Sequence, residues 1–354
     1  MSSSGITTLY QKQAARTARR PGLLSANIEV MQYRILGRTG WQISDIGYGA
    51  WGIGGNQWRG ASDDESREAL RKALELGLNF IDTALAYGDG HSEVLVGEIL
   101  RETGARALVA TKIPPKNRLW PARPGIGIEE VFPCKYAIEC TETSLRNLGV
   151  ETIDLQQFHV WNPEWIGREE WRRVIEDLKR AGKVRAFGIS INDHQPDSAL
   201  EAIHSGLIDT VQVIYNIFDQ SPERNLFPLC QKANIGVLAR VPLDEGALTG
   251  TITPDSVFDP HEFRAFYFRG ERKKEVYERV LYLKEDLKNA GVTEPLASTA
   301  LRFCLSHPAV STVIPGMRRV RNVIFNCDVS DAGPLASHVT EILRKHAWNK
   351  NYYS

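Results

Sequence analysis

Long apolar runs are absent from this 354-residue sequence: no stretch of about 18 consecutive apolar residues occurs, so we expect no transmembrane helix. Cysteine is scarce as well. The five cysteines are scattered, and none belongs to a CxxC motif or to a Cys/His cluster. This pattern argues against a disulfide framework and against a zinc site, and it predicts reduced thiols in a cytoplasmic protein without a bound metal.

An excess of charge of one sign is also lacking. The 43 lysines and arginines balance the 43 aspartates and glutamates, so the formal net charge is zero. No overall field then draws the protein to nucleic acid or to an anionic membrane surface. Hydrophobic residues make up 42% of the chain, which is ordinary for a globular protein with a large core.

Residues 1–30 differ in composition from the rest of the chain. They contain several basic residues and no acidic residue before Glu29. A transit peptide has such a composition, but the amphipathic pattern is poor, and we expect a disordered tail or an extension. The folded part is expected to be one barrel over residues 31–330, followed by a C-terminal helix and tail over residues 331–354.

Short apolar runs alternate with amphipathic segments from Tyr33 onward. The predicted strands are Ile46–Gly49, Asn79–Asp82, Ala107–Lys112, Ile153–His159, Val184–Ser190, Thr210–Tyr215, Gly236–Arg240 and Ser311–Pro315. Apolar residues at helical spacing predict helices between them, at Asp64–Leu76, Ser92–Arg101, Lys135–Leu148, Trp165–Ala181 and Glu223–Ala233.

Eight strand–helix units predict an α/β protein with a parallel sheet that closes into a (β/α)8 TIM barrel. An N-terminal β-hairpin is expected at residues 31–44, ahead of the barrel. The alternative is a doubly wound sheet, which carries a GxGxxG fingerprint after its first strand. Here Gly49–Gly55 is rich in glycine but has Trp51 in its middle, and no ribose-binding acid follows, so this motif is weak.

Ionisable side chains stand where three consecutive predicted strands end. The second strand ends at Asp82 in FIDTALAYG, and Tyr87 follows five positions later. The third strand ends at Lys112 and the fourth at His159. Each alone is most simply a strand terminator, a solvated charge or a hydrogen-bonded core group. In a barrel, however, the carboxyl ends of the strands form the active-site face, so we expect these four side chains to meet there.

Together the four groups suit proton transfer to a carbonyl oxygen. A tyrosine with a pKa of about 10 is a poor acid at neutral pH, and a nearby Lys112 ammonium would stabilise the phenolate and lower that pKa. Asp82 would keep Lys112 charged and fixed. His159 could donate a hydrogen bond to the substrate oxygen. Hydride would have to come from a cofactor.

These residues, in FIDTALAYGDGHSE, LVATK and IDLQQFHVW, resemble the aldo-keto reductases. The resemblance runs from about Tyr33 to Asn326 and includes, in the family's order, YRILGRTGWQISDIGYGAWGIGG, GKVRAFGIS, VQVIYNIF, PLDEGALTG and VIPG. It implies a barrel that binds NADPH, or less often NADH, and reduces an aldehyde or ketone to an alcohol, or runs in reverse. It implies Tyr87 as the general acid, assisted by Lys112, Asp82 and His159.

The resemblance also implies a set of cofactor contacts. Ser190 and Gln212 match the partners of the nicotinamide carboxamide, and Tyr215 matches an aromatic residue that stacks on the ring. The loop over the pyrophosphate corresponds to Leu243 and Gly246. The residues that bind the adenosine end correspond to Gly316, Arg318, Asn322 and Asn326. An arginine at position 318 favours a 2′-phosphate and therefore NADP(H) over NAD(H). The alternative is that the basic run RRVR is an exposed helix face.

The sequence departs from the family pattern at two places. Ile191 follows Ser190 where the family commonly has asparagine, which puts one carboxamide contact in doubt. Arg240 stands where many members have tyrosine or serine, and Asp244 and Glu245 where small or amide residues are common. Because two acids beside a pyrophosphate would repel it, we expect Arg240 to pair with them.

The substrate pocket is expected to be aromatic, with Trp51, Trp120 and Trp161 on its loops and the C-terminal tail over the barrel mouth. These aromatic residues could instead pack the loops together. A second functional hypothesis is a non-catalytic, nicotinamide-binding regulatory subunit that senses redox state. The intact set of four favours an enzyme. A metal-dependent hydrolase would need a His-x-His motif, whereas the histidines here are scattered.

Overall fold

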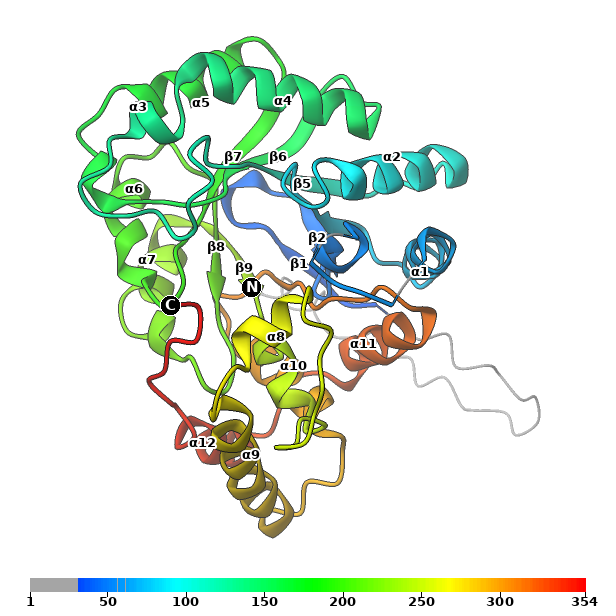
Figure 1. The fold of residues 1–354 in the computed structure, drawn as a ribbon. Helices are drawn as coiled ribbons and strands as arrows, with labels where there is room; N and C mark the ends of the chain where they lie inside the picture. The colour runs from blue at the N-terminus through cyan, green and yellow to red at the C-terminus, as the bar shows by residue number, and fades with distance from the viewer. Residues whose placement is uncertain (1–30, 56, 61) are drawn as a thin grey trace, which may run out of the picture.

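The structure is a computed structural model, and it describes residues 31–55, 57–60 and 62–354 (Figure 1). Its centre is an eight-stranded parallel sheet in which every strand lies beside its neighbours in the sequence, from β3 to β10. Isolated parallel bridges from Ile46 to Val313 and from Gly49 to Gly316 join the first strand to the last. The predicted (β/α)8 barrel is therefore confirmed. The extension predicted at residues 1–30 lies outside the described residues.

All eight predicted strands are present. Their bounds are β3 (Tyr48–Gly49), β4 (Phe80–Asp82), β5 (Leu108–Ile113), β6 (Ile153–Phe158), β7 (Val184–Ser190), β8 (Thr210–Ile214), β9 (Gly236–Arg240) and β10 (Thr312–Val313). β7 and β9 have the predicted bounds, whereas the first and last strands are shorter than expected. The strands read as apolar runs rather than alternating patterns because the barrel interior covers one face and the helices cover the other.

Helices surround the strands (Figure 1). They are α1 (Asp63–Glu75), α2 (His91–Thr103), α3 (Ile128–Val131), α4 (Cys134–Leu148), α5 (Glu170–Arg180), α6 (Leu200–His204), α7 (Leu226–Ala233), α10 (Leu296–Ser306) and α11 (Val320–Ala332). α1 opens with a capping box: Ser62 Oγ accepts from the Glu65 amide at 3.2 Å, and the Glu65 carboxylate accepts from the Ser62 amide at 3.1 Å.

The helix predicted at Trp165–Ala181 begins later than expected. The segment from Trp165 does not continue as one helix, because Pro163–Trp165 forms a short 3-10 helix, η3, and α5 begins only at Glu170. Asn162 caps η3 by accepting a hydrogen bond from the Glu164 amide at 3.0 Å. Trp165 lies before α5, but its side chain is buried like those on the inner face of the helix. Its place in the apolar pattern therefore made the helix look longer than it is.

The predicted N-terminal hairpin is confirmed. β1 (Tyr33–Ile35) and β2 (Gln42–Ser44) pair antiparallel. Leu36 and Ile43 are fully buried in a cluster with inward-facing strand residues such as Phe80, Leu155 and Leu238. The hairpin therefore closes one end of the barrel interior, which leaves the opposite end for the site.

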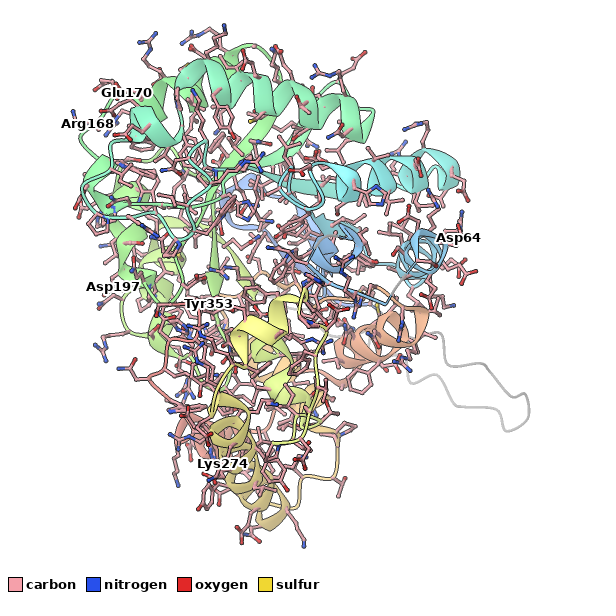
Figure 2. All side chains as sticks on the ribbon, viewed as in Figure 1. Asp64, Arg168, Glu170, Asp197, Lys274 and Tyr353 are labelled. Carbon is pink, nitrogen blue, oxygen red and sulfur yellow. The ribbon has the colours of Figure 1, made fainter. Side chains whose placement is uncertain are left out.

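Later segments of the chain lie at the barrel mouth: η6 (Asp244–Thr249), α8 (Phe263–Tyr267) and the C-terminal tail. α9 (Arg272–Asn289) and α12 (Ser337–Arg344) lie further out, at the lower edge of Figure 1. Tyr353 of the tail lies well inside the outline of the molecule, whereas Asp64 and Lys274 lie near its edge (Figure 2). Its hydroxyl donates to Glu245 of η6 at 2.7 Å, which confirms a C-terminal tail over the mouth. Within the described ranges, no helix combines the length and the apolar character that a membrane span requires.

Candidate active site

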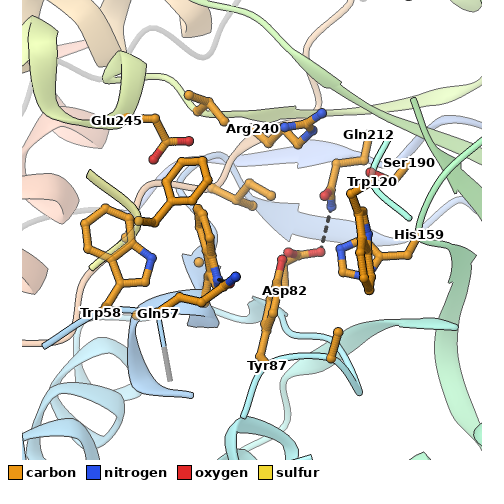
Figure 3. Close-up of a pocket in the computed structure, with 18 of the residues that line it drawn as sticks. Gln57, Trp58, Asp82, Tyr87, Trp120, His159, Ser190, Gln212, Arg240 and Glu245 are labelled. Atoms are coloured by element: carbon orange, nitrogen blue, oxygen red, sulfur yellow. Dashed lines mark hydrogen bonds between the residues drawn. The ribbon is translucent and has the colours of Figure 1, made fainter. Parts of the chain in front are cut away.

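A cavity of about 910 Å³ opens at the carboxyl ends of the barrel strands. It is lined by residues at or just beyond the ends of several strands, including Asp82, Tyr87, His159, Ser190, Gln212 and Arg240 (Figure 3). This is the face on which TIM barrels place their active residues, because each strand ends in a loop there.

Lys112 connects the acid and the phenol, as expected. Its Nζ donates to Asp82 Oδ2 at 2.7 Å, to the Thr83 carbonyl at 2.8 Å and to Tyr87 Oη at 3.3 Å. Lys112 is fully buried on β5, beside β4, whose last residue is Asp82. A buried ammonium is stable only when it is paired, and here three oxygens surround it. The lysine therefore lies beneath the pocket while Tyr87 faces it.

Burial decides the ionisation of the phenol. It raises the pKa of Tyr87 above its usual value, and the charge of Lys112 offsets this only in part. The net lowering that we expected from the sequence is therefore wrong for this structure. Burial also acts to lower the pKa of Lys112, but Asp82 and Tyr87 outweigh it, and the net pKa is raised. Tyr87 is thus a neutral phenol beside a charged lysine.

His159 completes the group as a neutral imidazole. Burial holds its pKa well below the usual value, and the charges of Lys112 and Arg240 lower it further. Its ring meets Tyr87 edge-on at 5.8 Å between centroids and Trp120 at 5.7 Å. The Nδ1 atom is buried without a hydrogen-bond partner in the described part of the chain. The structure therefore brings all four predicted groups together.

Gln212 reaches Asp82 from the other side of the barrel. Its Nε2 donates to Asp82 Oδ1 at 2.7 Å, while Lys112 occupies Oδ2. Ser190 is the register partner of Gln212 on the neighbouring strand, and both line the cavity. Asn192, two residues after Ser190, lines the same cavity. Its side-chain amide accepts a hydrogen bond from the Ala122 N–H and donates one to the Ala122 carbonyl, each at 3.2 Å.

Most of the residues predicted to bind cofactor line this cavity, but two do not. Tyr215 is buried against Phe303 and Phe227, and its hydroxyl donates to Glu223 at 2.6 Å. Side chains alternate along a strand, so with Gln212 facing the interior, Tyr215 faces the helices. Asn326 is buried on α11, away from the cavity. Those that line it are Ser190, Gln212, Leu243, Gly246, Gly316, Arg318 and Asn322.

Two of the three predicted substrate tryptophans reach the cavity. Trp51 lies nearly parallel to Tyr87 at 6.2 Å between ring centroids, and Trp120 approaches His159 from its own loop. Trp161 does not reach it. It is fully buried against Trp165 and Trp171, and its Nε1 donates to the Ser198 carbonyl at 3.1 Å.

The expected pair between Arg240 and the two acids of η6 was wrong. Arg240 Nη2 donates instead to Asp193 Oδ1 at 2.7 Å. Asp244 accepts from Lys350 Nζ at 2.5 Å, and Glu245 accepts from the Tyr353 hydroxyl. The C-terminal tail therefore supplies a partner for each acid, and Tyr267 of α8 also donates to Asp244, at 3.1 Å.

Sequence reasoning missed a contact that crosses the mouth. The carbonyl of Gln57 accepts a hydrogen bond from the Phe263 amide at 2.9 Å, and Trp51 Nε1 donates to Gln57 Oε1 at 2.7 Å. The guanidinium of Arg264 lies over the Trp58 ring, 5.2 Å from its centroid. The segments around Gln57 and Phe263 are some 200 residues apart in the sequence, and no motif or residue spacing predicts that they touch.

Comparison with known proteins agrees with this geometry. A family model described as the aldo/keto reductase family matches residues 45–347. The aldo-keto reductase YhdN of Bacillus subtilis is 32% identical over 82% of this chain and 86% of its own length. An NADH-specific methylglyoxal reductase of Escherichia coli is 32% identical over 84% and 94%. The solved structure of aldo-keto reductase AKR11C1 from Bacillus halodurans, holo form, is 27% identical, with a TM-score of 0.72, and covers 91% of this chain and 98% of its own.

Proposed function

Because the chain belongs to the aldo/keto reductase family, a family of NAD(P)H-dependent oxidoreductases, we propose that it reduces an aldehyde or ketone to an alcohol, or runs in reverse, with Tyr87 as the proton donor. The observation that carries the proposal is the position of Lys112 Nζ between Asp82 and Tyr87, at 2.7 and 3.3 Å. A protein that only binds nicotinamide has no need of a buried cation held against a phenol.

The residues of the cavity suit a nicotinamide dinucleotide. Ser190 and Gln212 offer a hydroxyl and an amide near the catalytic groups, and Arg318 and Asn322 line the same cavity. A Cβ built on Gly316 would meet no atom within 4 Å, so the backbone there borders open space that a ligand can approach closely. When bound, the reduced cofactor supplies a hydride to the carbonyl carbon.

The side chains manage the proton. Tyr87, neutral because of its burial, donates its proton to the substrate oxygen as negative charge develops there. Lys112 then stabilises the phenolate, and Asp82 keeps the lysine charged and in place. His159, a neutral imidazole, can donate one hydrogen bond to the same oxygen and fix its position. In the reverse direction the phenolate of Tyr87 accepts the proton of the alcohol.

We propose NADP(H) as the preferred cofactor, because Arg318 can pair with a 2′-phosphate. A small carbonyl compound would bind between Trp51 and Trp120, which both line the cavity. A cytoplasmic location is also a proposal. It rests on the five cysteines, all of which are free thiols, four of them buried.

Turnover tests the proposal. Loss of the absorbance of the reduced cofactor is followed with a panel of aldehydes and ketones. We expect Tyr87→Phe to lower kcat by at least about 100-fold while cofactor affinity stays within severalfold of the parent. Tight cofactor binding without turnover of any carbonyl would instead favour the redox-sensing subunit. Full activity of Tyr87→Phe would refute the proposed proton donor.

A further inference from the structure

Arg240 is a half-buried cation, 19% exposed, that the proposed mechanism does not use. It is the last residue of β9 and is paired in register with Ile214. Its Nη2 donates to Asp193 Oδ1 at 2.7 Å and to the Ile191 carbonyl at 3.0 Å, which fixes the orientation of the guanidinium. Its Nε is buried and has no hydrogen-bond partner among residues 31–55, 57–60 and 62–354.

The guanidinium faces the same cavity as the reacting groups (Figure 3). Its charge acts to lower the pKa of both Tyr87 and His159, so its field reaches the place where the carbonyl would bind. Lys112, the cation beside Tyr87, is balanced at contact distance by Asp82. Arg240 is paired with Asp193, and the two side chains are 19% and 18% exposed, so solvent screens this pair more than the buried pair of Lys112 and Asp82.

Three consecutive strands bring Arg240 to the place proposed for the nicotinamide. Ser190 ends β7, Gln212 lies near the end of β8, and Arg240 ends β9. A nicotinamide ring whose carboxamide is held by Ser190 and Gln212 lies close enough to Arg240 for the charge of the guanidinium to act on it. The oxidised nicotinamide ring carries a positive charge, whereas the reduced ring is neutral.

We propose that Arg240 is a selectivity residue that makes the site bind the reduced cofactor more tightly than the oxidised one. This inference rests on the proposed function. The fixed guanidinium repels the cationic ring, while its flat face can pack against the neutral ring. More of the enzyme then carries the reduced cofactor at any given ratio of the two forms, which suits carbonyl reduction.

The ratio of the two dissociation constants, oxidised over reduced, tests the proposal without turnover. Titrations of NADPH and NADP+ by calorimetry give this ratio for each variant. We expect Arg240→Gln to lower it by roughly tenfold, because the repulsion of the oxidised ring is lost. Arg240→Lys keeps the charge and should keep most of the ratio. Asp193→Asn should raise the ratio, because it unmasks the charge of Arg240.

Arg318→Gln is the matched control, since it removes a cavity-lining cation that we place at the adenosine end. It should weaken both redox forms alike and leave the ratio unchanged. An unchanged ratio in folded Arg240→Gln would overturn the proposal, as would shifts of the same sign in Arg240→Gln and Asp193→Asn. If Arg240→Gln does not fold, the sign of the Asp193→Asn shift still decides. If the parent protein binds neither form, the proposed function itself fails.

Discussion

Gln212 donates a hydrogen bond to Asp82 across the barrel, at 2.7 Å between Nε2 and Oδ1. The two residues lie on β8 and β4, which are separated in the sheet by β5, β6 and β7. The other oxygen of the same carboxylate accepts from Lys112. One buried carboxylate thus links the lysine behind Tyr87, the proposed proton donor, to a residue that we place at the nicotinamide. Changes at either end of this link should separate proton transfer from cofactor binding.

Asp82→Asn is expected to damage turnover far more than cofactor affinity. The substitution removes the charge that keeps Lys112 protonated and oriented, so the phenolate of Tyr87 loses its stabilisation. We expect kcat to fall by about 100-fold and the cofactor dissociation constant to change only severalfold. Steady-state kinetics and cofactor titration measure the two effects.

Gln212→Leu is the matched comparison, since it removes the amide and leaves the pair of Lys112 and Asp82 in place. Gln212→Leu should weaken cofactor affinity more than it lowers kcat. Equal losses of turnover and affinity in Asp82→Asn would show that Asp82 has been given the wrong role.

Arg318→Gln is expected to lower affinity for NADPH by about tenfold while affinity for NADH changes little, because a guanidinium–phosphate pair is a strong charge-assisted interaction. Arg318 lines the cavity, and its guanidinium also lies over the Trp58 ring, 5.6 Å from the centroid. Titration with both reduced cofactors checks the expectation. Arg321→Gln removes an exposed arginine on α11 and serves as the control. A similar fall for NADPH and NADH in Arg318→Gln would contradict a 2′-phosphate contact.

The barrel and the four central groups could be predicted from the sequence because their signals are local. Apolar runs end at the polar residues Asp82 and Lys112, and parallel strands bring such ends to one face. Tyr215 was misplaced although a local signal existed. Alternation along β8 turns it away from the face of Gln212, toward the helices.

Lys350 and Tyr353 could not be predicted as partners of the acids on η6, because they come from the far end of the chain. Lys350 and Tyr353 follow Asp244 and Glu245 by more than 100 residues. Arg240 was the nearest cation in the sequence, but its guanidinium turns to Asp193 on the β7 side. The distances that decide such pairs are set by the packing of the tail, and composition does not encode them.

Glu245 should make stability depend on pH. Burial, followed by the nearby charge of Asp244, raises its pKa from 4.5 to about 7, although the Tyr353 hydroxyl acts to lower it. Between these two values the folded state binds more protons than the unfolded state, so this group's contribution to stability is complete below about pH 4.5 and is lost as the pH rises to about 7. The full loss corresponds to about 3 kcal/mol at most.

Glu245→Gln should abolish this pH dependence, because its amide does not ionise. Relative to the parent, the variant should gain stability steadily between about pH 5 and pH 7 and hold a constant advantage above that. Denaturant unfolding of both proteins across this range measures the difference. Glu285→Gln, at an exposed position on α9, should leave the shape of the curve unchanged. If the stability difference between Glu245→Gln and the parent did not change with pH, Glu245 would not be the buried, proton-binding carboxylate that its contacts with Asp244 and the tail require.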